Sequence, residues 1–168
     1  MNFPPVRIVL APAAVIFERR DDLADLLTTC IADGASLGYF TPLATPRARA
    51  VFEALAQCTD DGTARVLIAI AGTKLAGCIA IFAESRETEP HLAKLGRLMV
   101  RPDYRRHGIA TALTHEAEAE AQSWGKTRLY LFTTDDGAAP AFYDHLGVAA
   151  RHHPRVCAIS SAISAQII

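Results

Sequence analysis

The chain has 168 residues, of which 51% are hydrophobic and 21% charged, and its 17 basic and 18 acidic residues give a formal net charge of −1. This length suits one domain with a single sizeable core, and the composition excludes global disorder. A sequence-independent nucleic-acid binder usually carries a surplus of positive charge, so the balance argues against that class. We therefore expect one domain over residues 1–168 and no nucleic-acid partner.

The cysteines and the first residues point to a cytoplasmic protein. The four cysteines, at positions 30, 58, 78 and 157, form no CxxC pair, so no metal site is expected. The "APA" at residues 11–13 has the small residues of a secretory cleavage site, but Arg7 interrupts the short apolar stretch before it. No run approaches the ~20 apolar residues that a membrane span needs, so we expect no membrane contact.

The first part of the chain predicts a strand followed by two helices. Asp21 or Asp22 is a suitable N-cap for the first helix, whose apolar stripe ends near Gly34. Thr45 is the expected N-cap of the second helix, with Pro46 at its first position. The expected elements are a strand over Val6–Leu10, a helix from about residue 22 to Gly34, a loop over Gly34–Leu43 and a helix to about Gln57.

The rest of the chain predicts strands with two further helices. "GTK" at residues 72–74 joins two apolar runs in the manner of a β-hairpin. Consecutive strands imply antiparallel pairing, whereas a strand–helix–strand unit implies one parallel pair, so the expected class is α+β. The expected elements are strands over Arg65–Ala71, Leu75–Ala83 and Lys94–Val100, a helix from Ile109 to about Trp124, a strand over Arg128–Phe132, a short helix over Gly137–Leu146 and one or two closing strands over Arg155–Ile168.

Positive charge gathers where the longest predicted helix begins. Arg105, Arg106 and His107 precede Gly108 in that turn, and Arg101 is close by. The first turn of a helix leaves backbone N–H groups without acceptors and carries the positive end of the helix dipole, so arginines there are unfavourable unless an anion binds. A glycine lets a bulky anion approach the backbone. The turn therefore predicts a phosphate-sized anion site, with solvated arginines at a helix start as the alternative, although neither GxxxxGK nor GxGxxG is present.

Two segments resemble the GNAT acyltransferase superfamily. "RRHGIA" at residues 105–110 matches its [RQ]-x-x-G-x-[GA] signature, and "APAFYDHLGV" at 139–148 resembles its A-x-x-[FL]-Y-x-x-L-G-F segment, with Val148 where Phe is usual. The separation of the two motifs and the order of the predicted elements are also similar. The resemblance implies a mixed, mostly antiparallel twisted sheet with helices on both faces and one parallel strand pair splayed at a cofactor slot.

The resemblance also implies that acetyl-CoA is the co-substrate. Backbone N–H groups from Arg106 to Thr111 would hold its pyrophosphate, the end of the fourth strand would pair with its pantetheine arm, and an N–H near Val100 would polarise the thioester carbonyl. Asp136 stands where the family often has an Asn that contacts the cofactor, and it equally suits a helix cap. The expected cofactor-binding residues are Leu98, Met99, Val100, Arg105, Arg106, His107, Gly108, Ile109, Ala110, Thr111, Asp136, Phe142 and Tyr143.

Two residues are candidates for catalysis. Tyr143 matches the family tyrosine near the CoA sulfur, which makes it the expected general acid, and core packing beside Phe142 is the alternative. Glu84 is the candidate general base, together with Glu87 and Glu89 of the same stretch, and a solvated loop is the alternative for each.

Substrate selection in this superfamily usually falls to the first two helices and their loop. Tyr39 and Phe40 are therefore candidate pocket walls, with packing of the helix pair as the alternative. So compact a loop suits a small amine or an amino-acid-like substrate better than a large protein. "LADLLTTCIADGASLGYF" and "KLGRLMV" look like the tabtoxin-resistance type of GNAT protein. Lys94 and Phe132 stand where that type has acidic residues, so a different amine is expected.

The resemblance implies an N-acetyltransferase that moves an acetyl group from acetyl-CoA to a primary amine of a small molecule by direct attack in a ternary complex. The alternative is a non-catalytic sensor or regulatory module that binds acyl-CoA on the same fold. A homodimer is a further expectation because dimers are frequent in the superfamily. The apolar tail "ISAQII" at residues 163–168 suits either an association edge or a last core strand.

Overall fold

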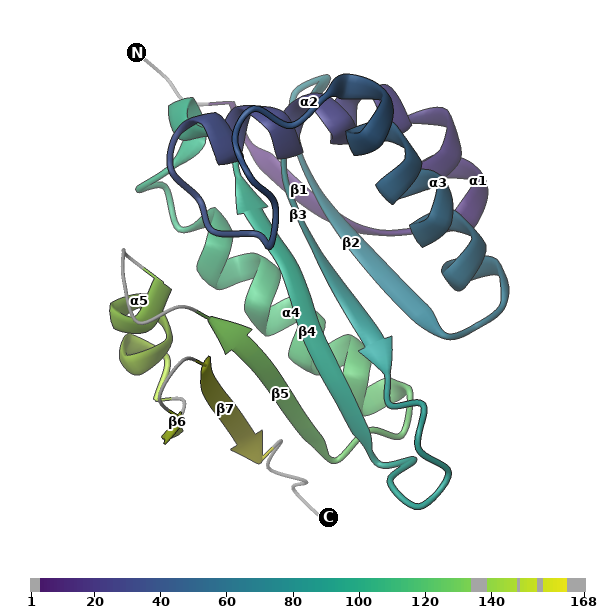
Figure 1. The fold of residues 1–168 in the computed structure, drawn as a ribbon, viewed down its shortest axis with the longest axis vertical. Coiled ribbons are helices and arrows are strands. Elements are labelled where there is room, and N and C mark those ends of the chain that lie inside the picture. Colours follow the sequence, from purple (N-terminus) through teal and green to yellow (C-terminus); the bar gives the residue numbers. More distant parts are fainter. Residues whose placement is uncertain (1–3, 134–138, 148, 154–155, 163–168) are drawn as a thin grey trace.

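Seven strands form one mixed sheet in the order β1-β2-β3-β4-β5-β7-β6, seen in Figure 1. This computed structural model describes residues 4–133, 139–147, 149–153 and 156–162. The strands are β1 (Val6–Ala11), β2 (Ala64–Ala71), β3 (Lys74–Ala83), β4 (Leu92–Val100), β5 (Arg128–Thr133), β6 (Ala149–His153) and β7 (Val156–Ala162). The helices are α1 (Ala13–Glu18), α2 (Arg20–Ala32), α3 (Thr45–Asp60), the 3-10 turn η1 (Pro102–Tyr104), α4 (Ile109–Ser123) and α5 (Ala139–His145).

The strand pairing confirms the predicted α+β class. Neighbouring strands are antiparallel except β4 and β5, which are parallel. Helix α4 connects these two strands, as a parallel crossover requires. The predicted hairpin is also confirmed, because Ala71 pairs with Lys74 across a turn in which Gly72 has a φ of 62°.

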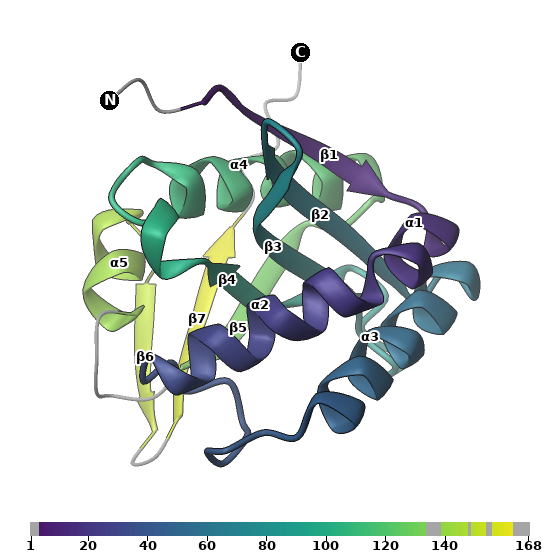
Figure 2. The same cartoon turned by 90° about the horizontal axis from the view of Figure 1, so that it is seen from above.

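Helices cover both faces of the sheet, as expected. Figure 2 shows α1, α2 and α3 on one face and α4 on the other. Alternation along the strands divides the core accordingly, since successive strand side chains point to opposite faces. In β3, Cys78 and Ala80 pack under α1–α3, whereas Ile79 and Ile81 pack under α4. None of the helices in the described ranges is both long and apolar enough to cross a membrane.

The beginning of the chain differs from the prediction. Helix α1 was not expected, and it follows β1 because Pro12 takes its N-cap position in extended backbone and Ile16 is buried beneath it. Helix α2 then starts at Arg20, so the predicted cap at Asp21 or Asp22 is wrong. Thr45 is the first residue of α3 rather than its cap, which is Ala44. Apolar periodicity locates a helix better than it locates the first residue.

Candidate functional site

Strands β4 and β5 share only a short ladder and then separate. Their register contains three residue pairs, of which the last joins Lys94 to Tyr130. Beyond that pair, β4 continues to Val100 beside β3 and β5 continues to Thr133 beside β7. The two strands therefore splay toward their carboxyl ends, as the family resemblance implied, and Figure 1 shows the gap opening toward η1.

A β-bulge lies in β4 at the level of the splay. Gly96 pairs with Ala80 and Met99 with Cys78, so Arg97 and Leu98 together lie opposite Ile79. Arg97 has a φ of 53°, in the left-handed region that a non-glycine residue seldom occupies. Such bulges are frequent beside functional sites because they turn a strand and re-aim its side chains.

The entrance to α4 has the backbone of an anion site. Arg106 and Gly108 have φ values of 65° and 76°, and Gly108 is the N-cap. The first helical N–H with a backbone acceptor is that of Ala112, which donates to the Gly108 carbonyl at 2.9 Å. Helix geometry therefore leaves the three preceding N–H groups without an intrahelical acceptor. A Cβ at Gly108 would meet no atom within 4 Å, so the backbone faces open space.

One cavity of about 540 Å³ connects the α4 entrance with the ends of β4 and α5. It contains eleven of the thirteen residues expected to bind the cofactor. The lining residues are Cys30, Ala35, Leu98, Met99, Val100, Tyr104, Arg105, Arg106, Gly108, Ile109, Ala110, Thr111, Ala139, Phe142 and Tyr143. The two motifs of the sequence, 105–110 and 139–148, thus meet across the same cavity.

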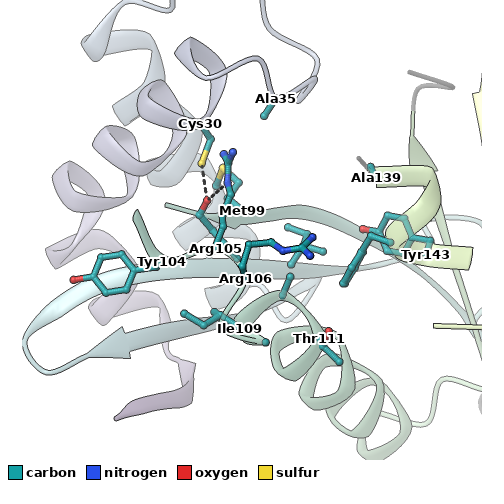
Figure 3. A pocket seen from close by; sticks show the side chains of 15 residues that line it. Cys30, Ala35, Met99, Tyr104, Arg105, Arg106, Ile109, Thr111, Ala139 and Tyr143 are labelled. Carbon is teal, nitrogen blue, oxygen red and sulfur yellow. Dashed lines mark hydrogen bonds between the residues drawn. The ribbon is translucent and has the colours of Figure 1, made fainter. Parts of the chain in front are cut away.

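The two neighbouring arginines of the motif, Arg105 and Arg106, differ in their contacts with the protein. Arg105 donates from Nε to the Val100 carbonyl at 3.2 Å and forms an ion pair with Asp33, so its guanidinium joins β4 to the end of α2. Arg106 is exposed, and no carboxylate of the described ranges lies within ion-pair distance of it. Figure 3 shows its side chain extending from the loop toward the part of the cavity formed by α5. Arg106 is therefore the cation of this pair that can neutralise a bound anion.

Arg101 and Cys30 also connect α2 with the end of β4, where the two elements form one wall of the cavity. Arg101 donates to the Leu75 carbonyl at 2.9 Å and pairs with Asp25 of α2 at 2.6 Å. The buried Cys30 thiol lies 3.5 Å from the Val100 carbonyl oxygen, and burial raises the pKa of this thiol. It stays protonated at neutral pH, so it packs the wall and does not supply a thiolate nucleophile.

Tyr143 lies on α5 with its side chain in the cavity. The residue is only 7% exposed, and its ring packs edge to face against the Phe142 ring, with 5.1 Å between the ring centroids. Burial raises the pKa of the Tyr143 phenol to about 12. Its hydroxyl has no protein partner among the described residues, so it keeps a proton that a group in the cavity can receive.

The structure places Glu84 outside the cavity, next to the start of the splay. Its carboxylate accepts hydrogen bonds from the Arg86 guanidinium at 3.2 Å and from the Tyr130 hydroxyl at 2.8 Å. These partners, Arg86 first, hold the pKa of Glu84 at about 2. Of its two companions, Glu87 is exposed and Glu89 pairs with Arg86 at 2.7 Å.

The two candidate pocket walls occupy different environments. Tyr39 is half-buried against the core beneath α1–α3, and its hydroxyl accepts a 3.3 Å hydrogen bond from Arg97. Phe40 is 94% exposed. Neither residue lines the cavity described above, which reaches the same loop only at Ala35.

The remaining expected residues are His107 and Asp136. His107 is exposed, with its Nδ1 2.7 Å from the Arg105 carbonyl oxygen, and it does not line the cavity. Asp136 lies outside the described residues. Within the described ranges, no group of three or more His, Cys, Asp or Glu side chains is arranged to hold a metal ion.

Sequence reasoning missed four residues that line the cavity. Tyr104 lies directly before the basic turn and was available to a local argument, whereas Ala139 opens the second motif. Cys30 and Ala35 come from α2 and the loop after it, far from both motifs in the chain. No local pattern indicates which residues of α2 will face β4.

Comparisons with known proteins agree with this architecture. The sequence model of the acetyltransferase (GNAT) family matches residues 31–148. No curated protein is similar enough in sequence to match the chain.

Several solved structures share the fold. The PaiA N-acetyltransferase of Thermoplasma acidophilum, solved with coenzyme A, is 16% identical, with 94% of this chain and 99% of that chain covered at a TM-score of 0.77. A GNAT-family acetyltransferase of Streptococcus pneumoniae is 18% identical, with 95% and 100% covered at a TM-score of 0.74. A Salmonella typhimurium protein solved with its cofactor acetyl-CoA is 14% identical, with 98% and 97% covered at a TM-score of 0.73.

Proposed function

Since the chain belongs to the GNAT acetyltransferase family and is an acetyl-CoA-dependent acyltransferase, we propose that it acetylates a primary amine of a small molecule by direct attack within a ternary complex. The observation that carries this proposal is the single cavity that joins the α4 entrance, the splayed end of β4 and the Tyr143 side chain. Phosphate binding, thioester placement and proton donation are the three requirements of the reaction, and residues suited to each line this one space.

The residues of the cavity fit acetyl-CoA. The open space at Gly108 and the N–H groups of the first turn of α4 suit a pyrophosphate, and Arg106 adds a positive charge beside them. The end of β4 offers backbone groups that β5 does not pair, which suits an extended amide-bearing arm. We assign the pyrophosphate to residues 106–111 and the arm to Leu98, Met99 and Val100.

The bound acetyl-CoA supplies an activated acyl group as a thioester. In the transfer, the amine nitrogen forms a C–N bond to the acetyl carbon and the C–S bond breaks. Tyr143 holds its proton because its pKa is about 12, and it donates that proton to the departing sulfur. The proton lost by the amine passes to water, from which Tyr143 regains the proton that it donates. An N–H near Val100 polarises the carbonyl as negative charge develops there.

Glu84 remains the candidate base, with a restriction. A carboxylate with a pKa of about 2 is a weak proton acceptor. The fraction of neutral amine is therefore set mainly by the amine's own equilibrium with water, and the rate should rise with pH until the acceptor is deprotonated.

Thiol release tests the proposal. Purified protein, acetyl-CoA and a panel of small primary amines are combined, CoA thiol is measured, and mass spectrometry identifies the acetylated product. Turnover with at least one amine supports the acetyltransferase. Tight CoA binding in calorimetry without turnover across the panel would instead favour the non-catalytic sensor.

The proposal also includes a cytoplasmic location and a homodimer, which fractionation and analytical ultracentrifugation test directly.

A further inference from the structure

Arg97 occupies a costly position for an ordinary surface arginine. It lies in the β4 bulge with a φ of 53°, directly before Leu98, the first β4 residue that lines the cavity. Its side chain is directed to the face of the sheet covered by α1–α3, where its Nη1 donates to the Tyr39 hydroxyl at 3.3 Å. Figure 1 shows the loop that carries Tyr39 crossing in front of β4.

The Arg97 guanidinium is half-buried and has few partners. Its Nε is buried without a hydrogen-bond partner in the described part of the chain. No described carboxylate forms an ion pair with it, and Glu84, in the loop after β3, is already held by Arg86 and Tyr130. Removing a cation from water is unfavourable unless it is paired, so a half-buried guanidinium without a carboxylate partner is suited to bind an anion.

A further cation lies on the same face. Lys94 has its ammonium 5.3 Å from the centre of the Phe82 ring, and no carboxylate of the described residues pairs with it. Lys94 is also the residue at which β4 and β5 separate. The positive charges thus gather on the face of the splay that α4 does not cover.

We propose that Arg97 binds a carboxylate of the acceptor, so that the acceptor is an amino acid or a closely similar amino carboxylate. The planar guanidinium matches a carboxylate and offers donors that the protein leaves unused. In an α-amino acid a single carbon separates the carboxylate from the amine. Arg97 does not itself line the cavity but directly precedes Leu98, which does, so the proposal places the amine at the border of the cavity. This inference rests on the proposed acetyltransferase function.

The test compares amino acids with their carboxamides, which keep the amine and the side chain but lose the negative charge. The variants are Arg97→Gln and, as a matched control, Arg47→Gln, which removes an exposed arginine that contacts the same tyrosine. Glutamine carries the same backbone cost as arginine at a positive φ. Thermal melting verifies that each variant folds. Arg97→Lys adds a second probe, since it keeps the charge but loses the planar fork.

We expect the wild-type protein to prefer the acids, and Arg97→Gln to raise KM for them about 10- to 100-fold with little change in kcat. The carboxamides should respond little to Arg97→Gln, and Arg47→Gln should leave both classes nearly unchanged. Equal turnover of acids and carboxamides by the wild type would overturn the Arg97 assignment while leaving the acetyltransferase intact.

Calorimetry separates the two proposals if turnover is absent. The CoA-loaded protein is titrated with an amino acid and then with its carboxamide. Binding of the acid alone, lost in Arg97→Gln, supports the carboxylate site even without catalysis. Absence of binding by both ligands, or equal binding of both, overturns it.

Discussion

The hydroxyl of Tyr130 donates a 2.8 Å hydrogen bond to Glu84 from the last residue pair that β4 and β5 share. Arg86 donates to the same carboxylate oxygen at 3.2 Å, and together these bonds favour the charged form of Glu84. Each of the two partners belongs to a different segment, since Tyr130 is in β5 and Arg86 follows β3. The interaction therefore ties the loop after β3 to the start of the splay.

Glu84 should make the protein sensitive to acid in a defined window. Its pKa is about 2 in the folded chain against an ordinary value of 4.5, so its contribution is fully present above about pH 4.5 and is lost as the pH falls toward 2. Glu84→Gln should lower Tm at neutral pH, and its difference from the wild type should shrink across that window. Melting curves from pH 2 to 7 measure this. Glu87→Gln, at an exposed position of the same loop, should show no such trend.

Gly108→Glu should abolish most of the affinity for CoA. It places a side chain and a negative charge where the backbone faces open space at the α4 entrance, and we expect a loss of about 100-fold or more in calorimetry. Gly125→Glu is the matched control, because Gly125 has a φ of 75° and equally open surroundings just beyond the other end of α4. Each substitution costs about 1–2 kcal/mol of backbone strain. Equal CoA affinity in the two variants would contradict the assigned pyrophosphate site.

Arg106→Gln and Arg105→Gln should separate binding from stability. Arg106→Gln is expected to weaken CoA binding about 10-fold or more and to reduce its dependence on salt, with little change in Tm. Arg105→Gln removes the ion pair to Asp33 and the bond to Val100, so it should lower Tm. Calorimetry at two salt concentrations and thermal melting give both quantities. A fall in Tm for Arg106→Gln without loss of affinity would remove it from the anion site.

Tyr143→Phe should lower turnover far more than binding. The phenylalanine keeps the ring contact with Phe142 but has no proton to donate, so kcat should fall about 100-fold while the Kd for CoA stays nearly constant. Because the pKa of Tyr143 is about 12, the wild-type rate should show no loss from its ionisation up to about pH 10. Steady-state kinetics across pH and calorimetry measure the two effects. Parallel changes in kcat and Kd would leave Tyr143 with a packing role only.

Gly77→Ala should damage the wall of the cavity. A Cβ at Gly77 would lie 2.5 Å from the Met99 carbonyl oxygen and 3.3 Å from Leu113, so β4 has to shift. Overpacking of this kind costs about 1–3 kcal/mol. Gly96→Ala is the control in the neighbouring strand, because its Cβ would meet only the edge of the Phe82 ring, at 3.3 Å. Denaturant unfolding should show a larger loss of the free energy of unfolding for Gly77→Ala than for Gly96→Ala, and calorimetry should show weaker CoA binding by Gly77→Ala.

The local parts of the site were predictable from the sequence. The basic turn from Arg105 to Gly108 lies within a few residues of the helix that it opens, so charge, glycine and helix periodicity could be read together. The short helix with Tyr143 was predictable for the same reason. The parallel pair of β4 and β5 followed from the strand–helix–strand order.

The parts of the site that join residues far apart in the chain could not be predicted from the sequence. Asp33 pairs with Arg105 across 72 positions, and nothing in either neighbourhood marks the partner. The bulge at Arg97 could not be predicted either. An apolar run predicts a continuous strand, and a bulge is recognised only once the pairing register with the neighbouring strand is known. Helix α1 was missed because the apolar residues after Pro12 are too few to show a helical period.

The short ladder between β4 and β5 has a mechanical consequence. In the described part of the chain, three residue pairs provide the sheet's hydrogen-bonded connection between β1–β4 and β5–β7. The sheet therefore consists of two groups of strands joined by a short ladder, which we call the seam. The width of the opening between β4 and β5 depends on the angle between the two groups. We therefore expect a bulkier acyl chain to be accommodated by a tilt of one group of strands against the other. Tolerance for acyl length should then depend on this seam as much as on the residues that line the cavity.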